Sequence, residues 1–269
     1  MLTKTEAIVL HNIKYGETKI IVDMFTRQLG RLSFAVALSR SQRGAMKKQY
    51  FQPLSMLTIT FDYRPQQQLQ KLSEVAILHP LSTMLYEPSK LSISLFLSEF
   101  LYHALKGEQE NEPLFDYVTT ALQWLDSRDK GFVNFHLVFL MHLSRFLGFD
   151  YRGGDYRLQR GDYRLQREDY RLQTEDYRLK TIDFRQNEFF DLRAAMFCSA
   201  PPVHRDFLGS EETAMLRLMM RMDYHNMHLF RMTHQQRNRC VEVALQFYRL
   251  HLPDFPDLRA LDVLRDLWE

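Results

Sequence analysis

The sequence predicts an α+β multi-domain protein, in which a small five-stranded antiparallel barrel over residues 1–80 precedes an all-α helical domain over residues 81–269. Two observations predict this fold class. Apolar residues alternate with a period of two in the first part, as in half-buried strands, and their spacing becomes helical beyond Pro80. The composition, with 45% hydrophobic and 25% charged residues, is that of an ordinary globular protein.

Strand-like runs separated mostly by short turns fill the first eighty residues. They cover residues 5–13, 18–25, 31–38, 57–61 and 68–78. The run Leu57–Phe61 alternates strictly between apolar and polar residues, which favours a strand with one buried face. Five such runs suit the oligonucleotide-binding (OB) barrel, which binds single strands across one face and the neighbouring loops. SH3-like barrels have a similar size and strand number, so the pattern alone does not choose between the two.

Helical spacing predicts segments at about 89–106, 132–147 and 258–267. Further helices are expected to begin at the capping residues Asn111, Ser210 and Thr233, because their side chains accept hydrogen bonds from the first turn of a helix. Segment 132–147 is apolar almost all round, so it is expected to be the central buried helix. Its His136 and His142 therefore indicate core or edge positions rather than ligands.

Positive charge is concentrated in the first part of the chain. Residues 1–80 hold 11 Lys and Arg against 5 Asp and Glu, whereas residues 81–269 hold 24 against 28. Segment 39–48 carries four positive charges and no negative one, and Tyr50 and Phe51 follow it. A cationic loop that ends in aromatic rings suits a phosphate backbone with bases to stack on. The alternatives are a solvated surface loop and aromatic rings that belong to the barrel core.

A heptapeptide repeat interrupts the helical part at about residues 150–187. Asp155–Gly161 recurs with a period of seven, with Tyr and Leu two positions apart. This spacing fits neither a coiled-coil seam nor a strand, because an odd period exchanges the faces of a strand at each repeat. The pattern predicts an irregular loop expanded by duplication. The alternative is an arm that contacts nucleic acid or a partner, although 8 acidic residues accompany 9 basic ones over 150–185.

Signatures of catalysis are missing. The sequence has no Gly-rich phosphate loop, no Gly-x-Ser-x-Gly and no His-Glu-x-x-His. Cys198 and the histidines at 204, 225 and 228 match no recurring zinc spacing. The acids Asp23, Asp62 and Glu74 leave a metal-dependent nuclease as an alternative, but nothing pairs them in sequence. We expect a protein that is not an enzyme and that holds no metal and no cofactor.

No run of about 18 apolar residues predicts a membrane span. The first residues lack the layout of a signal peptide, and the two cysteines, Cys198 and Cys240, form no Cys-x-x-Cys pair. We therefore expect a cytoplasmic protein.

The order of these features resembles the RecO family of bacterial recombination mediators, which act in DNA repair. The resemblance covers almost the full length except about 150–187. The resemblance rests on several segments that occur in the same order, rather than on one diagnostic motif. The matching segments are residues 5–10, 15–17, 25–26, 30–32, 40–54, 137–149 and 258–265.

The resemblance implies an OB-type barrel followed by a helical domain. It implies binding of single- and double-stranded DNA, annealing of complementary strands without ATP, and a nucleoid-associated location. It also implies RecR and the single-stranded DNA-binding protein as partners in loading RecA on gapped DNA. The family's basic barrel segment maps onto Arg31, Arg40, Arg43, Lys47 and Lys48 as DNA contacts, with Tyr50 and Phe51 as stacking candidates.

The chain departs from the family pattern in two places. Many members carry a four-cysteine zinc site after the buried helix, where this chain has the repeat and then only Cys198, so we predict no structural zinc. The family's contact for the acidic, hydrophobic tail of the single-stranded DNA-binding protein lies near the start of the buried helix. Val133 and Asn134 stand where arginines are expected, with Lys130 or Arg145 as substitutes.

Three hypotheses follow. The leading one is a non-enzymatic mediator that binds and anneals DNA. In the second, a protein adaptor, the helical domain binds partner proteins and the barrel is only a tether. The third is a metal-dependent nuclease, which would shorten DNA.

Overall fold

The computed structural model describes residues 2–38, 47–149, 151 and 188–266. The chain forms two compact units, residues 1–127 with 256–269 and residues 128–255. The heptapeptide repeat and the centre of the basic loop lie outside the described residues.

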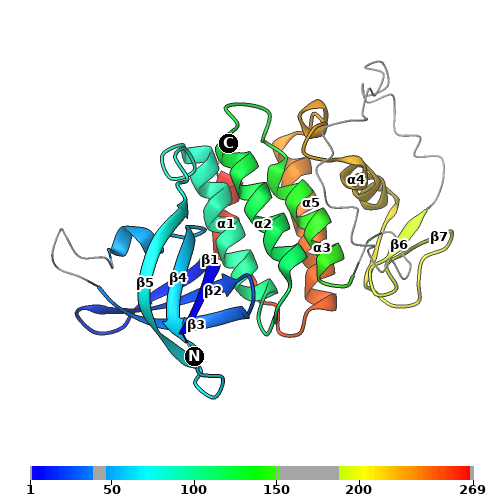
Figure 1. Ribbon diagram of the computed structural model, residues 1–269. Coiled ribbons are helices and arrows are strands. Elements are labelled where there is room, and N and C mark those ends of the chain that lie inside the picture. The colour runs from blue at the N-terminus through cyan, green and yellow to red at the C-terminus, as the bar shows by residue number, and fades with distance from the viewer. Residues whose placement is uncertain (1, 39–46, 150, 152–187, 267–269) are drawn as a thin grey trace. The chain divides into compact units, whose positions relative to one another are not determined.

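The first unit contains a closed five-stranded barrel (Figure 1), which confirms the predicted OB-type fold class. Its strands follow the order β1-β2-β3-β5-β4, with β4 paired to β1. A short 3-10 helix, η1 (Lys48–Phe51), precedes β4. The strands are β1 (Leu2–Lys14), β2 (Lys19–Thr26), β3 (Gly30–Ala37), β4 (Met56–Asp62) and β5 (Leu69–His79).

One pairing in the barrel is parallel, whereas the sequence predicted an antiparallel barrel. β3 and β5 run in the same direction, and the other four pairings are antiparallel. The reason is geometric: strand direction cannot alternate all the way round a closed ring with an odd number of strands.

The barrel core follows from the alternation of side chains along the strands. On β2, Ile20, Val22 and Met24 point into a cluster of buried hydrophobic residues, while Lys19 and Ile21 lie on the outer side. The core residues contributed by the other strands include Val9, Phe34, Ile59, Phe61 and Leu72.

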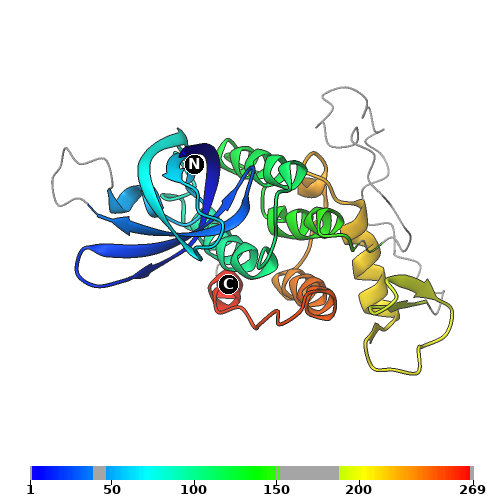
Figure 2. The same ribbon diagram turned by 60° about the horizontal axis from the view of Figure 1, so that its bottom comes forward.

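Three helices belong to the first unit: α1 (Pro88–Ala104), α2 (Glu112–Asp126) and α6 (Ala260–Asp266). The predicted cap at Asn111 is confirmed, since its Oδ1 accepts a hydrogen bond from Leu114 N at 3.1 Å. α6, red in Figure 2, packs against α1. The carboxylate of Glu99 accepts hydrogen bonds from the backbone N–H groups of Arg259 (3.0 Å) and Ala260 (2.6 Å), so α1 holds the start of α6 in place.

A buried lysine in this unit has a structural role. Lys90 is fully buried, and its Nζ donates to Thr83 Oγ1 at 2.7 Å. Asp126, at the end of α2, accepts hydrogen bonds from the backbone N–H groups of Ser82, Thr83 and Met84. Burial raises the pKa of Asp126, but these N–H bonds outweigh it and hold the pKa below its ordinary value. The network fixes the segment between the barrel and α1.

The second unit contains α3 (Phe135–Phe146), α4 (Ser210–Arg221), the 3-10 helix η2 (Met227–Leu229) and α5 (His234–His251). α3 is buried almost all round, as predicted, and Tyr248 of α5 donates to its Leu140 carbonyl at 2.8 Å. His136 is 1% exposed, and burial together with the charge of Arg237 lowers its pKa to about 3. It is therefore a neutral core histidine.

Of the two helix starts predicted in this unit, one is confirmed and the other is shifted by one residue. Thr233 forms the expected capping box with Gln236. The cap of α4 is Gly209 rather than Ser210, and Ser210 is the first helical residue. A small sheet in the order β7-β6-β8 was not predicted, because strands of two or three residues show no periodicity. Its strands are β6 (Phe189–Asp191), β7 (Met196–Cys198) and β8 (Phe207–Leu208).

Candidate nucleic-acid interface

The outer face of strands β1, β2, β3 and β5 carries exposed lysines between small and apolar side chains. Residues directly opposite each other on paired strands share a face. In this register Lys71 lies opposite Ala35, Ala35 opposite Ile21, and Ile21 opposite Ile13. Lys19, paired with Ala37, lies on the same face because it is two positions from Ile21.

The turn between β1 and β2 extends this face. Lys14 lies opposite the core residue Ile20, so its side chain alternates to the other side of the sheet and is exposed where β1 ends. Tyr15 in the turn is 59% exposed. Ile13 beside them is 47% exposed. We give the name lysine face to the outer residues Lys19, Lys71, Ile13, Ile21 and Ala35, together with Lys14 and Tyr15 at the adjoining end of the barrel.

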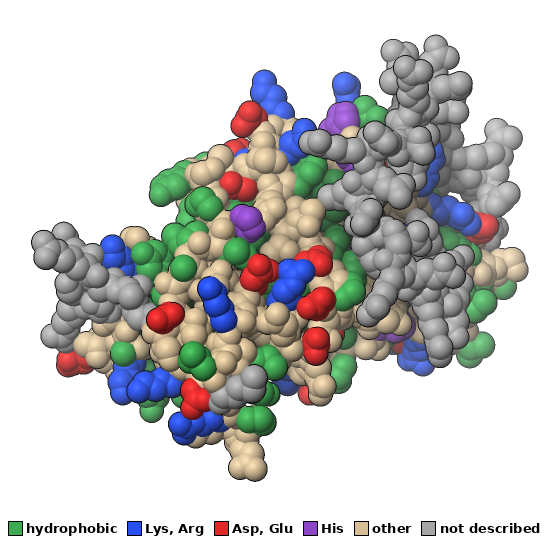
Figure 3. All heavy atoms as spheres, viewed as in Figure 1, with side chains coloured by type: hydrophobic (Ala, Val, Ile, Leu, Met, Phe, Trp, Pro, Cys, Tyr) green, Lys and Arg blue, Asp and Glu red, His purple; other side chains and the backbone are tan. Residues whose placement is uncertain are grey.

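The lysine face has three lysines, and the turn beside them carries one exposed acid, Glu17. No ion pair joins Lys14, Lys19 or Lys71 to another residue within the described part of the chain. Arg27, elsewhere on the barrel, is different: its guanidinium lies 2.8 Å from Glu6 and 2.7 Å from Asp116. Burial lowers the pKa of Arg27, but the bond to Glu6 and the nearby carboxylates raise it above its ordinary value. Figure 3 shows blue Lys and Arg side chains along the lower edge of the barrel.

Arg31, a predicted DNA contact, is engaged within the protein. Its side chain is 15% exposed, and its guanidinium carbon lies 4.2 Å from the centre of the Tyr102 ring of α1. Nη1 donates to the Tyr102 carbonyl, and Nη2 lies 4.0 Å from Asp23 Oδ1. The structure therefore places Arg31 as a contact between β3 and α1, with little of it left for a phosphate.

The basic loop is described only at its end. Arg40 and Arg43 lie outside the described residues. Lys47 is half-buried and Lys48 is exposed at the start of η1, and neither forms an ion pair with a described residue. Both remain candidates for phosphate contact.

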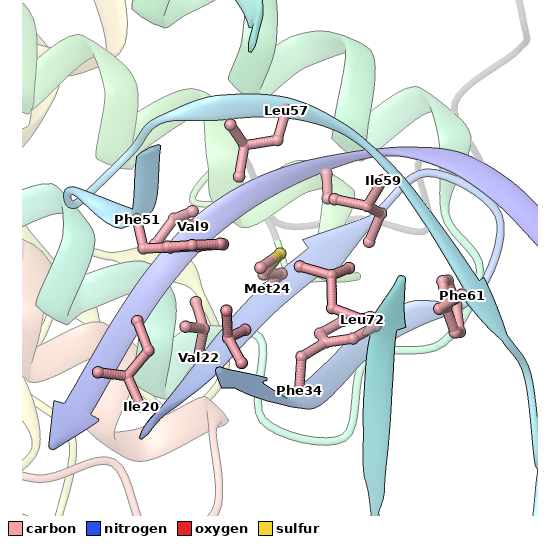
Figure 4. Packing of buried hydrophobic residues seen from close by; sticks show 12 residues of the cluster. Val9, Ile20, Val22, Met24, Phe34, Phe51, Leu57, Ile59, Phe61 and Leu72 are labelled. Atoms are coloured by element: carbon pink, nitrogen blue, oxygen red, sulfur yellow. The ribbon is translucent and has the colours of Figure 1, made fainter. Parts of the chain in front are cut away.

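The two aromatic residues after the loop are not equivalent. Phe51 is 1% exposed and belongs to the barrel core (Figure 4), and its carbonyl accepts a hydrogen bond from Asn12 Nδ2 at 2.7 Å. Its ring cannot stack on a base, so the core alternative replaces the stacking role. Tyr50 is half-buried and packs against the same core, so it remains a candidate for stacking.

A pocket of about 250 Å³ lies in the second unit beside the start of α3. Its lining is apolar with a few cationic groups. The lining residues are Gly131, Val133, Asn134, Met227, His228, Phe230, Arg231, Met232 and Arg237.

Arg237 and Asn134 build the floor of this pocket. Arg237 is 8% exposed, and its Nε donates to Asn134 Oδ1 at 3.1 Å. Asn134 in turn donates to the carbonyls of Met227 (3.0 Å) and Phe230 (2.8 Å). Burial lowers the pKa of Arg237. Arginines were expected at 133 and 134, and here the positive charge comes from Arg231 and Arg237 near the start of α5.

Among the described residues, no group of three or more His, Cys, Asp or Glu is placed to hold a metal ion. None of the helices in the described ranges has the length and apolar character that crossing a membrane requires.

A closed OB-type barrel with a lysine-rich outer face, continued by helices, defines an OB-fold protein with an added helical region. Comparison with known families agrees. The model of the N-terminal part of recombination protein O matches residues 1–81, and that of its C-terminal part matches residues 85–152. The chain belongs to the RecO family of DNA repair proteins.

Curated relatives match over their whole length. A DNA repair protein RecO from Phocaeicola vulgatus is 46% identical over 268 residues, and one from Bacteroides fragilis is 41% identical over 275. A third, from Azobacteroides pseudotrichonymphae, is 31% identical over 269 residues. Each alignment covers the whole of both chains.

Proposed function

We propose that this protein binds single- and double-stranded DNA on its lysine face and anneals complementary strands without ATP, as a non-enzymatic mediator of recombination. The observation that carries the proposal is the absence of ion pairs between Lys14, Lys19 or Lys71 and other described residues. Unpaired ammonium groups on an exposed sheet are free to replace the counterions of a phosphate backbone. Lys47 and Lys48, and the loop residues Arg40 and Arg43 on family grounds, are further proposed phosphate contacts.

The mechanism uses charge neutralisation rather than recognition of sequence. Two complementary strands repel each other through their phosphates, and a cationic surface that holds both lowers this repulsion. Contacts to phosphates carry no sequence information, so a bound strand can shift until its bases find their partners. The exposed ring of Tyr15 suits stacking on a base, which is tolerant of sequence. A role on DNA corresponds to a cytoplasmic, nucleoid-associated location.

The test is fluorescence anisotropy of a labelled single strand with the full-length protein across a salt series. The logarithm of the affinity should fall linearly with the logarithm of salt concentration, with a slope of about −2 or steeper for three or more phosphate contacts. Annealing of complementary strands should accelerate without ATP. The proposal fails if no binding occurs at low salt, or if the DNA is shortened when a divalent metal is added, which would indicate a nuclease.

The pocket of the second unit suits a partner with an acidic, hydrophobic tail, and we propose that it takes the C-terminal tail of the single-stranded DNA-binding protein. Val133, Met227 and Phe230 offer an apolar lining, while His228 and Arg231 are exposed beside them.

RecR is a further proposed partner on family grounds, tested by whether adding it speeds RecA assembly on coated, gapped DNA. An adaptor without DNA binding is the alternative function, and this pocket is the observation that favours it.

The substitution Arg231→Glu should weaken binding of a synthetic peptide that ends in acidic and then apolar residues by about tenfold or more, since it removes a charged partner and adds a repulsive one. Arg231 is preferred to Arg237 because Arg237 also holds Asn134 in place. Arg259→Glu, the same charge change on an exposed arginine of the first unit, is the control. Equal losses in the two variants, measured by calorimetry, would argue against the pocket.

A further inference from the structure

Beside the lysine face runs a second row of outward side chains. In this row His11 lies opposite Asp23, Asp23 opposite Ser33, and Ser33 opposite Leu69. Each member is two positions along its strand from a member of the neighbouring row, a separation of about 7 Å. Asp23 therefore stands at the border of the lysine face.

Asp23 is surrounded by groups that respond to its negative charge. The Ser33 hydroxyl donates to its Oδ1, Arg31 Nη2 lies 4.0 Å from the same oxygen, and His11 Nδ1 lies 3.8 Å from Oδ2. The Asp23 side chain is 11% exposed, whereas that of His11 is 44% exposed. The only acid in this row thus faces the two cationic or potentially cationic side chains next to the lysine face.

The neighbours of this group fix its geometry. Tyr102 of α1 lies under the Arg31 guanidinium and contacts the His11 ring at 4.6 Å between centroids. Arg31 therefore cannot swing away from Asp23 without losing its contacts to Tyr102. The negative charge is held in place between His11 and Arg31, at the border of the lysine face.

We infer that Asp23 limits the DNA affinity of the lysine face, by neutralising Arg31 and by repelling a phosphate from the row that contains His11. Asp23 is a positioning residue: it sets where the DNA-binding surface ends. The inference rests on the proposed function. It has a physical rationale in annealing, because a strand that is held too tightly cannot shift into register with its complement.

The test is the substitution Asp23→Asn in the full-length protein, with a labelled single strand as probe. Asn has the same shape and keeps an acceptor for the Ser33 hydroxyl. The expected result is a gain of up to about fivefold in affinity at about 0.1 M salt and a salt slope steeper by up to about 0.7, because one negative charge beside the lysine face is removed. Asp23→Thr, a second neutral side chain that suits a strand, should give the same gain if Asp23→Asn does not fold.

The matched control is Glu74→Gln, which makes the same change in net charge on β5. Glu74 is exposed and lies in a different row, opposite Thr60, which is opposite Lys4. An equal gain in this control would reduce the effect to overall charge and overturn the inference. An unchanged or weaker affinity of a folded Asp23→Asn protein would overturn it too. If the wild type itself binds no DNA, the proposed function fails instead, so the two failures are distinguishable.

Discussion

The triple substitution Lys14→Ala/Lys19→Ala/Lys71→Ala is expected to weaken binding of single-stranded DNA by about a hundredfold at about 0.1 M salt. Each phosphate contact contributes about 0.7 to the slope of log affinity against log salt on single strands. Between about 1 M and about 0.1 M salt, one contact therefore raises the affinity about fivefold. Three contacts therefore account for the loss, and the slope should become shallower by about two. Fluorescence anisotropy across a salt series measures both quantities.

The control for this prediction changes the same number of charges elsewhere. Lys4, Lys106 and Lys130 are exposed and lie outside the lysine face. Their combined substitution by Ala should leave affinity and slope close to those of the wild type. If both triple variants lose affinity equally, net charge alone governs binding and the lysine face is not the site. If only the face variant loses DNA while still binding the acidic peptide, the adaptor alternative is separated from DNA binding.

The local features of the fold were predictable because they depend on short stretches of sequence. Alternation placed the five strands, and a capping box placed Thr233 at the start of α5. The parallel pairing of β3 with β5 follows from closing five strands, yet it became visible only once the order of the strands was known. The cap of α4 moved from Ser210 to Gly209, one position, which sequence patterns do not resolve.

The candidate site was less predictable because it is made by contacts between distant residues. Family resemblance predicted Arg31 as a DNA contact, but its guanidinium donates a hydrogen bond to the carbonyl of Tyr102, which is 71 positions away. Phe51 follows a basic loop and yet fills the barrel core. Lys71 joins the lysine face only through the register of β5 against β3. Asn134 and Arg237, which build the pocket together, are 103 positions apart.

One signal for the lysine face was nevertheless present in the sequence. On the second strand, Lys19 and Ile21 alternate with the apolar Ile20 and Val22, so their side chains had to point away from the core. The run of basic residues at 39–48 is the more conspicuous cationic pattern in the sequence. Charges that lie on one face of a strand are separated by other residues in the sequence, so they are harder to recognise than a run of consecutive charges.

Gly30→Ala is expected to destabilise the protein by about 2–5 kcal/mol, from strain in the left-handed region and from a steric clash in a closely packed site. Gly30 has φ +66°, and a Cβ there would lie 2.3 Å from the Glu108 carbonyl oxygen and 2.6 Å from the backbone of Gln109. The same turn is tied to that segment by the Arg31 N–H, which donates to the Glu108 carbonyl at 3.0 Å. The added methyl group must therefore push the segment between α1 and α2 away from the barrel.

Gly16→Ala separates these two causes. Gly16 also has a positive φ, +77°, but nothing lies within 4 Å of a Cβ at that position. Its substitution should cost only the conformational strain, about 1–2 kcal/mol. Urea unfolding of both variants measures the difference, and equal losses would show that the close approach at Gly30 relaxes freely. A larger loss at Gly30 would mean that the contact between the β2–β3 turn and the α1–α2 segment is rigid.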